Sequence, residues 1–148
     1  MRKVAVIGSS GAIGSAFVDH YINDQSINSI FSFSRSSIGI DNNKVKHFSI
    51  DIENENSVQD AAKSVEEINF DEIIIASGLL HTNEFGPEKS IKDLKADNIL
   101  KILNVNTVGP AIIGKHFLPL LNKNNKSVMA FLSARVGSIS ENKLGGWY

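Results

Sequence analysis

Three glycines near the start of the chain have the spacing of a phosphate-binding turn. Gly8, Gly11 and Gly14 directly follow the apolar run Val4–Ile7, and a helical pattern begins near Ser15. Glycine permits a tight turn and close backbone approach, and the first amides of the helix are free to bind an anion. Because strand, glycine-rich turn and helix occur in this order, we interpret the segment as a dinucleotide-binding loop rather than a turn that merely requires glycine.

The end of the next predicted strand, Ser29–Ser34, indicates which dinucleotide is bound. NAD sites usually place an acidic residue about 20 residues beyond the glycines, on the ribose 2′-hydroxyl. The segment 27–40 contains no Asp or Glu, and Arg35 follows Ser34 at the expected place. An arginine flanked by hydroxyls can pair with a 2′-phosphate. The sequence therefore favours NADP(H), with NAD(H) possible; the alternative is a surface arginine in a serine-rich turn.

Apolar runs alternate with helical patterns along the chain. Strands are expected at Val4–Ile7, Ser29–Ser34, Val45–Ile50, Glu72–Ala76 and Ser127–Ser133, and helices at 14–24, 57–68 and 90–121, the last interrupted near Gly109-Pro110. This alternation implies right-handed crossovers and a parallel sheet. We predict one α/β domain over residues 1–148, a doubly wound parallel sheet (Rossmann fold) of about five strands in the order 3-2-1-4-5. Its ligand should lie at the switch point beside the first strand.

Composition narrows the classes of partner. A formal net charge of −1 gives no field that would attract nucleic acid or an anionic membrane. The chain has no cysteine, which removes disulfides and thiolate chemistry, and its histidines show no ligand spacing with carboxylates, so no metal is expected. No apolar run approaches the ~18 residues of a membrane span. These features predict a cytoplasmic protein.

Five segments, in order, resemble the motifs of the short-chain dehydrogenase/reductase family. They are the glycine loop 8–14, Asp51-Ile52, Ala76-Ser77-Gly78, Asn104–Pro110 and Ser133–Ile139. The run Val136–Ile139, followed later by Gly145-Gly146-Trp147-Tyr148, is most similar to the C-factor-like and sniffer-like carbonyl reductases. The resemblance covers nearly the whole chain.

The resemblance implies an NADP(H)-dependent oxidoreductase that acts on a small carbonyl or alcohol substrate, and a possible homo-oligomer. It implies cofactor binding by Gly8, Ser10, Gly11, Ile13, Gly14, Ser34, Arg35, Asp51, Ile52, Ala76, Ser77 and Gly78. It implies catalytic roles for Asn106 and for Ser133, with Ser138 as the alternative serine. In the family, a tyrosine protonates the substrate carbonyl, and a lysine four residues later lowers the pKa of that tyrosine.

Three positions depart from the family pattern. The 8-11-14 glycine spacing, with Ala12 in place of a glycine, matches the longer epimerase-like branch, so an epimerase-like enzyme is a further possibility. Ala76 replaces the usual asparagine, which alters hydrogen bonding near the adenine. Ala134 stands where the family has its catalytic serine, which is why two serines compete for that role.

The tyrosine–lysine pair of the family does not occur in this sequence. Its two tyrosines are Tyr21 and Tyr148, and neither begins a Tyr-x-x-x-Lys motif. We therefore expect an N-terminal portion of a longer reductase, C-terminally incomplete and inactive alone. The fifth strand would then be an open edge beside exposed apolar surface such as Phe131. The alternative from another class is a non-catalytic dinucleotide-binding module that acts as a sensor or scaffold.

Overall fold

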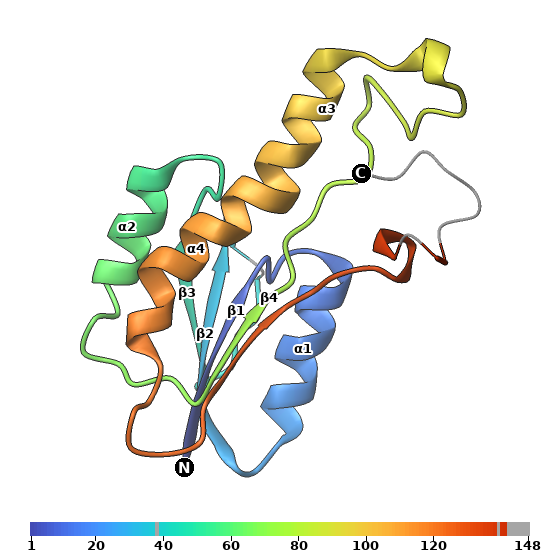
Figure 1. Ribbon diagram of the computed structural model, residues 1–148. Helices are drawn as coiled ribbons and strands as arrows, with labels where there is room; N and C mark the ends of the chain where they lie inside the picture. Colours follow the sequence, from blue (N-terminus) through green and yellow to red (C-terminus); the bar gives the residue numbers. More distant parts are fainter. Residues whose placement is uncertain (38, 139, 142–148) are drawn as a thin grey trace.

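The computed structural model describes residues 1–37, 39–138 and 140–141, and its centre is a parallel sheet (Figure 1). The strand order is β3-β2-β1-β4-β5, as predicted. The strands are β1 (Arg2–Ile7), β2 (Ile27–Ser34), β3 (Val45–Ser49), β4 (Glu72–Ile75) and β5 (Val128–Phe131). All neighbouring strands run parallel, so their carboxyl ends share one edge of the sheet. This is the doubly wound Rossmann arrangement that the sequence predicts.

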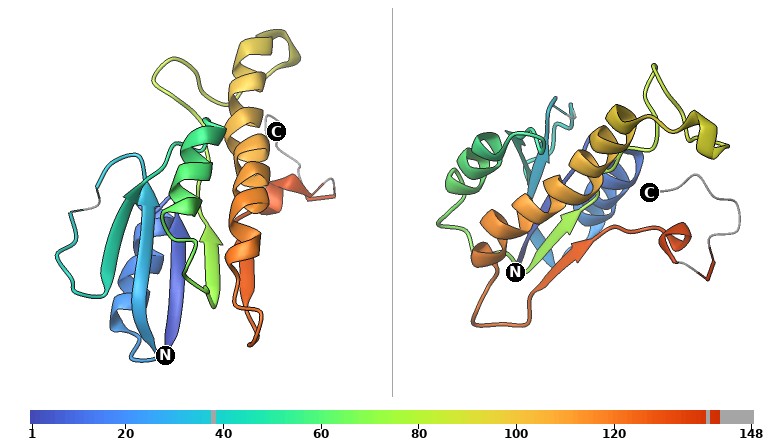
Figure 2. Two further views of the ribbon diagram at one scale, coloured as in Figure 1. Left: turned by 90° about the vertical axis from the view of Figure 1, so that its left-hand side faces the viewer. Right: turned by 45° about the horizontal axis from the view of Figure 1, so that its top comes forward.

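Helices cover both faces of the sheet (Figures 1 and 2). Helix α1 (Ala12–Asn23) packs on one face, where Val18 and Tyr21 join a cluster with β1 and β2. Helices α2 (Glu55–Lys63) and α4 (Gly109–Phe117) pack on the other face. Helix α3 (Ala96–Leu103) precedes α4 and extends beyond the carboxyl edge of the strands. Because both faces are covered, the central strands are apolar at successive positions rather than at alternate ones.

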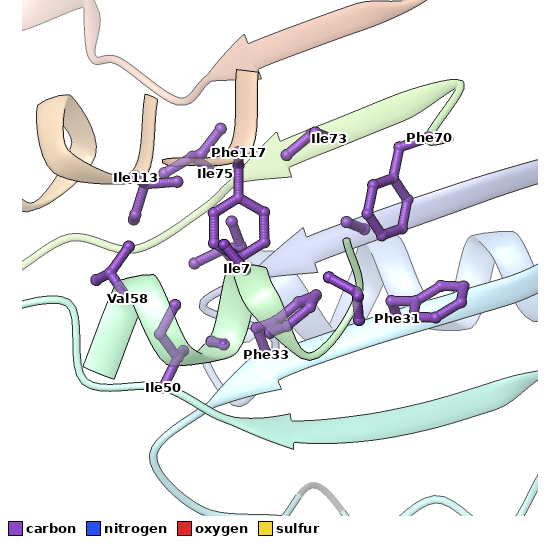
Figure 3. Close-up of a cluster of buried hydrophobic side chains, with 14 residues drawn as sticks. Ile7, Phe31, Phe33, Ile50, Val58, Phe70, Ile73, Ile75, Ile113 and Phe117 are labelled. Atoms are coloured by element: carbon purple, nitrogen blue, oxygen red, sulfur yellow. The ribbon is translucent and has the colours of Figure 1, made fainter. Parts of the chain in front are cut away.

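Phenylalanine side chains fill much of the core between the sheet and α2 and α4 (Figure 3). The rings of Phe33 and Phe117 meet edge to face with centroids 5.3 Å apart. Phe31 and Phe70 make a similar contact at 5.1 Å, and Phe48 stacks on both β2 rings. Burial of each such ring stabilises the fold by about 2–3 kcal/mol. These contacts join β2 to β3, to the start of β4 and to the end of α4.

The helices differ from the predicted ranges at their ends. Helix α2 begins at Glu55 rather than residue 57, because the Asn54 side chain accepts hydrogen bonds from the amides of Asn56 and Ser57. It ends at Lys63 instead of residue 68, so the prediction was wrong at its C-terminal end. The predicted helix 90–121 starts with a 3-10 turn at Ile91–Asp93 and ends with another at Leu118–Leu120.

The predicted interruption near Gly109-Pro110 is a π turn, Asn104–Val108, that joins α3 directly to α4. The helical path continues through it (Figure 1). Pro110 lies in the first turn of α4 and has no amide to donate back into the π turn, so the helical hydrogen-bond pattern is interrupted there while the path continues. The prediction of a break was therefore wrong in kind, because the chain changes its helical pitch without leaving the helix.

In the described part of the chain, β5 pairs with β4 alone. Phe131 at its end is 48% exposed and Val128 at its start is 43% exposed. The open, apolar edge expected from the sequence is thus present among these residues. None of the described helices is long and apolar enough to cross a bilayer.

The amino end of the sheet contains a buried tyrosine hydroxyl that supplies a test of the fold. Tyr21 donates a hydrogen bond of 2.7 Å to Glu72 Oε2, and the other Glu72 oxygen pairs with Arg2. Burial, and then the Glu72 carboxylate, raise the pKa of Tyr21. Tyr21→Phe should lower the free energy of unfolding by about 1.5–3 kcal/mol, because a hydrogen bond to a charged group is lost while the ring remains. Urea denaturation measures this change.

A double-mutant cycle with Glu72→Ala, which removes the acceptor oxygens, provides the control for Tyr21→Phe. The two substitutions should be non-additive, since they share one interaction. Strict additivity would show that the hydroxyl–carboxylate contact contributes nothing to stability.

Candidate functional site

The glycine turn lies against the backbone of β4 and leaves no room for side chains at two positions. Gly8 has φ +86°, and a Cβ there would lie 2.7 Å from the amide nitrogen of Ser77. A Cβ at Gly14 would overlap the carbonyl oxygen of Gly8 and come within 2.9 Å of Ser9 Cα. The Gly11 amide closes the turn by donating to the Gly8 carbonyl at 3.1 Å. The first turn of α1 therefore packs directly on backbone.

A groove opens at the carboxyl ends of β1 to β4, around this turn. It is lined by Gly8, Ser10, Gly11, Ser34, Arg35, Ile50, Asp51, Ile52, Glu53, Ala76, Ser77 and Gly78. The structure thus brings together ten of the twelve residues predicted to bind the cofactor. The other two lie outside the lining: Ile13 is 51% exposed on the first turn of α1, and Gly14 is buried beneath the glycine turn.

Two features of the groove suit an anionic ligand. Helix α1 begins at Ala12 after the N-cap residue Gly11, with no side chain capping its amides and no acidic residue in its first turn, whereas α2 is capped by Asn54. The positive end of the α1 dipole therefore faces the groove without a counter-charge. Arg35, at the end of β2, is exposed, and no hydrogen bond or ion pair within the described chain holds its guanidinium.

The loop after β3 adds two carboxylates, one of which sequence reasoning missed. Asp51 Oδ1 accepts a hydrogen bond of 3.1 Å from the amide of Glu53. Glu53 Oε2 accepts bonds from Lys101 Nζ at 2.6 Å and from Asn104 Nδ2 at 3.1 Å. These bonds, that from Lys101 above all, lower the pKa of Glu53. Glu53 is thus charged but paired, and its position follows from α3 and the π turn, which no motif around residue 53 indicates.

The π turn contacts the loops on both sides of the groove. Asn106 donates from Nδ2 to the carbonyl of Leu79 at 2.7 Å, and its Oδ1 accepts from the Leu79 amide at 2.7 Å. Asn104 bonds Glu53, and the backbone of Gly109 lies so close to Ile52 that a Cβ would be 3.2 Å from its carbonyl oxygen. π turns are frequent at functional sites. This one fixes the loop after β3 and the loop after β4 with one short segment.

One side-chain oxygen in the groove wall lacks a partner among the described residues. Ser77 Oγ is buried from solvent and makes no hydrogen bond there. Ser77 follows β4 and lines the groove, and its backbone touches the glycine turn. Buried hydroxyls are normally hydrogen-bonded. The wall of the groove therefore holds one buried hydroxyl that is unsatisfied among the described residues.

The predicted catalytic serine lies at the same edge of the sheet but outside this groove. Ser133 is exposed and follows β5 by two residues, next to Leu132, whose amide donates to the Ile75 carbonyl at 2.9 Å. The alternative, Ser138, is also exposed and lies 3.0 Å from the hydroxyl of Ser140. Trp147 and Tyr148 lie outside the described residues. The roles of Asn106, Ser133 and Ser138 stay predictions.

The fold and the groove at its switch point place the chain in the doubly wound, Rossmann-fold class. Among solved structures, it is similar to a short chain dehydrogenase family protein from Francisella tularensis, with TM-score 0.78 and 19% identity over 94% of this chain and 53% of that one. It is also similar to the NADPH-bound carbonyl reductase from chicken fatty liver, with TM-score 0.84, 22% identity and coverage of 97% and 61%. A protein assigned as the carbonyl reductase Sniffer of Caenorhabditis elegans gives TM-score 0.82, 22% identity and coverage of 97% and 67%. The resemblance to the short-chain dehydrogenase/reductases is thereby confirmed, and the chain has their fold.

Curated relatives extend the likeness to sequence. A UDP-glucose 4-epimerase from Rickettsia bellii is 30% identical over 126 residues, which are 76% of this chain and 36% of that protein. The 1-hydroxy-2-glutathionyl-2-methyl-3-butene dehydrogenase of Rhodococcus sp. is 29% identical over 101 residues, 67% of this chain and 41% of the relative. No protein-family model matches the chain. The chain spans about two fifths of the length of these curated relatives.

The contact between Gly14 and Gly8 provides a direct test of the glycine turn. Gly14→Ala should lower the free energy of unfolding by at least about 2 kcal/mol, because the new methyl group must displace backbone rather than a side chain. Chemical denaturation measures this. The matched control is Gly86→Ala, where no atom lies within 4 Å of the added Cβ and φ is not positive. A Gly14→Ala protein as stable as Gly86→Ala would contradict the packing described for the turn.

Proposed function

We propose that the chain forms the NADP(H)-binding part of a short-chain dehydrogenase/reductase that transfers hydride between the nicotinamide and a carbonyl or alcohol substrate. The observation that carries this proposal is the single groove that joins the glycine turn to Arg35. The turn provides free helix amides, and Arg35 provides a cation at the end of β2, the strand beside β1. The NADPH-bound chicken carbonyl reductase of the same fold supports it.

The residues of the groove fit a phosphorylated dinucleotide. The glycine turn and the start of α1 would hold the pyrophosphate, since no side chain fills this cradle and no cap occupies the amides. Arg35 and Ser34 would hold the 2′-phosphate, because a guanidinium can make two parallel bonds to a phosphate. Asp51 and Ile52 border the adenine side. Ser77 would satisfy its buried hydroxyl on the ligand.

The substrate side of the mechanism uses residues that lie at the same edge of the sheet but outside the groove lining. When bound, NADP(H) supplies or accepts the hydride. We propose that Asn106 acts chiefly by positioning, because both polar atoms of its side chain already bond Leu79. Ser133 would donate a hydrogen bond to the substrate oxygen, where negative charge develops. No Tyr-x-x-x-Lys occurs in the sequence, so these 148 residues would bind the cofactor without completing the proton transfer.

Cofactor titration tests the binding role. The wild type should bind NADPH more tightly than NADH. Arg35→Ala should weaken NADPH binding about 10–100-fold and leave NADH nearly unchanged, since only NADPH loses a charge-assisted contact. Fluorescence or calorimetric titration measures both. The matched control is Arg135→Ala, which removes an arginine with a 90% exposed side chain that lies outside the groove. Equal wild-type affinities for NADPH and NADH would overturn the assignment of the 2′-phosphate site.

Turnover separates an incomplete reductase from a complete one. The purified 148-residue chain should bind NADPH yet oxidise none of it above background with a panel of aldehydes and ketones, because it lacks the tyrosine–lysine proton donor. Absorbance at the nicotinamide band follows the reaction. Sustained turnover would show that another donor in these residues protonates the carbonyl. A longer protein that contains this chain and a Tyr-x-x-x-Lys motif provides the second comparison. If it binds NADPH as tightly as the 148-residue chain and still shows no turnover, the sensor or scaffold function is favoured instead.

A further inference from the structure

A continuous chain of polar side chains runs beneath the glycine turn, on the face of the sheet covered by α1. Ser9 and Ser32 are fully buried and Ser34 is 4% exposed. Ser32 Oγ lies 3.3 Å from His47 Nδ1 and 2.8 Å from Ser9 Oγ. Ser9 Oγ lies 3.3 Å from Ser34 Oγ, which in turn lies 2.7 Å from the carbonyl oxygen of Ser36. The chain thus connects the exposed side of β3 to the end of β2, through the turn.

Strand register and chain topology bring these groups together. Ser32 on β2 pairs with His47 on the neighbouring strand β3, so their side chains leave the same face of the sheet. Ser34 lies two residues after Ser32 and therefore points the same way. The glycine turn reaches them because the amides of Gly8 and Ser9 both donate to the carbonyl of Phe33, at 2.9 and 3.2 Å. Three buried hydroxyls placed in this way must bond one another, since unbonded ones would be costly.

The chemistry of the last acceptor fixes the direction of every bond in the chain. A carbonyl oxygen can only accept, so the single hydroxyl proton of Ser34 points to Ser36. Ser34 must then accept from Ser9, and Ser9, having given its proton to Ser34, must accept from Ser32. Ser32 therefore gives its only hydroxyl proton to Ser9. His47 is consequently the donor of the chain, through Nδ1–H.

This direction excludes one protonation form of His47. The Nδ1–H tautomer and the imidazolium cation both donate from Nδ1, whereas the Nε2–H tautomer offers only a lone pair there. With that lone pair, two oxygens of the chain would face each other without a proton between them. His47 is partly exposed on β3 and lies outside the groove lining, so it acts on the groove through the three serines.

We propose that His47 is a positioning residue whose Nδ1–H, through Ser32 and Ser9, holds Ser34 and the adjoining Arg35 in place for the 2′-phosphate. This inference rests on the proposed function. The glycine turn serves any dinucleotide, but the Ser34–Arg35 segment serves only the phosphorylated one. Loss of this chain of hydrogen bonds should therefore weaken NADPH binding more than NADH binding. A cluster that served stability alone would weaken both equally.

Two substitutions of nearly the same shape isolate the donor. His47→Asn places an amide NH₂ donor at about the position of Nδ1, whereas His47→Asp offers only acceptor oxygens. The ratio of NADPH to NADH affinity should stay near the wild-type value in His47→Asn and fall about 5-fold in His47→Asp, the effect of one net hydrogen bond. Ser32→Ala, which breaks the hydrogen-bond chain in its middle without adding the negative charge of Asp, should reproduce the fall. A wild-type affinity ratio in Ser32→Ala would assign the effect of His47→Asp to charge and overturn the proposal. Thermal unfolding confirms that each variant is folded at the titration temperature.

Equal affinity ratios in His47→Asn and His47→Asp would overturn the proposal, as would a proportional loss of both affinities. The nitrogen chemical shifts of His47 provide a measurement that needs no cofactor. Nδ1 should carry a proton at neutral pH, and an Nε2–H tautomer would contradict the deduced direction of the hydrogen bonds. Failure of the wild type to bind NADPH would instead overturn the proposed function, and with it the proposed effect of these hydrogen bonds on cofactor selectivity. The tautomer of His47 would still be measurable and would be unaffected by that failure. The two failures therefore appear in different measurements.

Discussion

The contact between the glycine turn and the backbone around it is the constraint on which the groove depends. Gly14 packs on the carbonyl of Gly8, and Gly8 in turn packs on the backbone that follows β4. The turn also bonds β2, because the amides of Gly8 and Ser9 both donate to the Phe33 carbonyl. The groove opens beyond these contacts and is lined both by Gly11, at the start of α1, and by Arg35, which follows β2. A single methyl group at either glycine would separate the helix from the turn and alter the floor of the groove.

The walls of the groove depend on a second constraint, the π turn between α3 and α4. Asn104 and Asn106 lie two residues apart in this turn, so their side chains project toward different loops. Asn104 bonds Glu53 after β3, and Asn106 bonds Leu79 after β4. A regular α-helix over the same residues would present a different set of side chains to these loops. The same segment thus sets the separation of two walls that are distant in sequence.

Most residues that local motifs assign to the cofactor line one groove, because they follow the strands that position them. Gly8, Ser34, Asp51 and Ala76 each stand at a strand end, and a parallel sheet gathers all strand ends at one edge. Ile13 was assigned to the cofactor through its motif, yet it lies on the exposed side of the first turn of α1. The resemblance to a family assigns residue positions without specifying which way each side chain faces.

Features that depend on distant partners could not be predicted in this way. Glu53 is held by Lys101 and Asn104, roughly fifty residues later, and nothing in its own neighbourhood indicates that contact. Ser32 and Ser34 of β2 alternate with phenylalanines, which is a pattern typical of a half-exposed strand. The structure buries them instead, because Ser9 and His47 supply the partners that their hydroxyls require. Pairing among buried polar groups is a property of the assembled sheet.

The charge balance of the groove follows from these distant contacts. A carboxylate beside a phosphate site would repel the phosphate, and Glu53 is close enough to Arg35 for the guanidinium to contribute to its lowered pKa. The ammonium of Lys101 and the amide of Asn104 take up Glu53 Oε2, so Arg35 is not required as its counter-ion. Arg35 thereby keeps its five donors for a ligand. The proposed preference for a phosphorylated dinucleotide thus depends on α3 and the π turn as well as on the arginine.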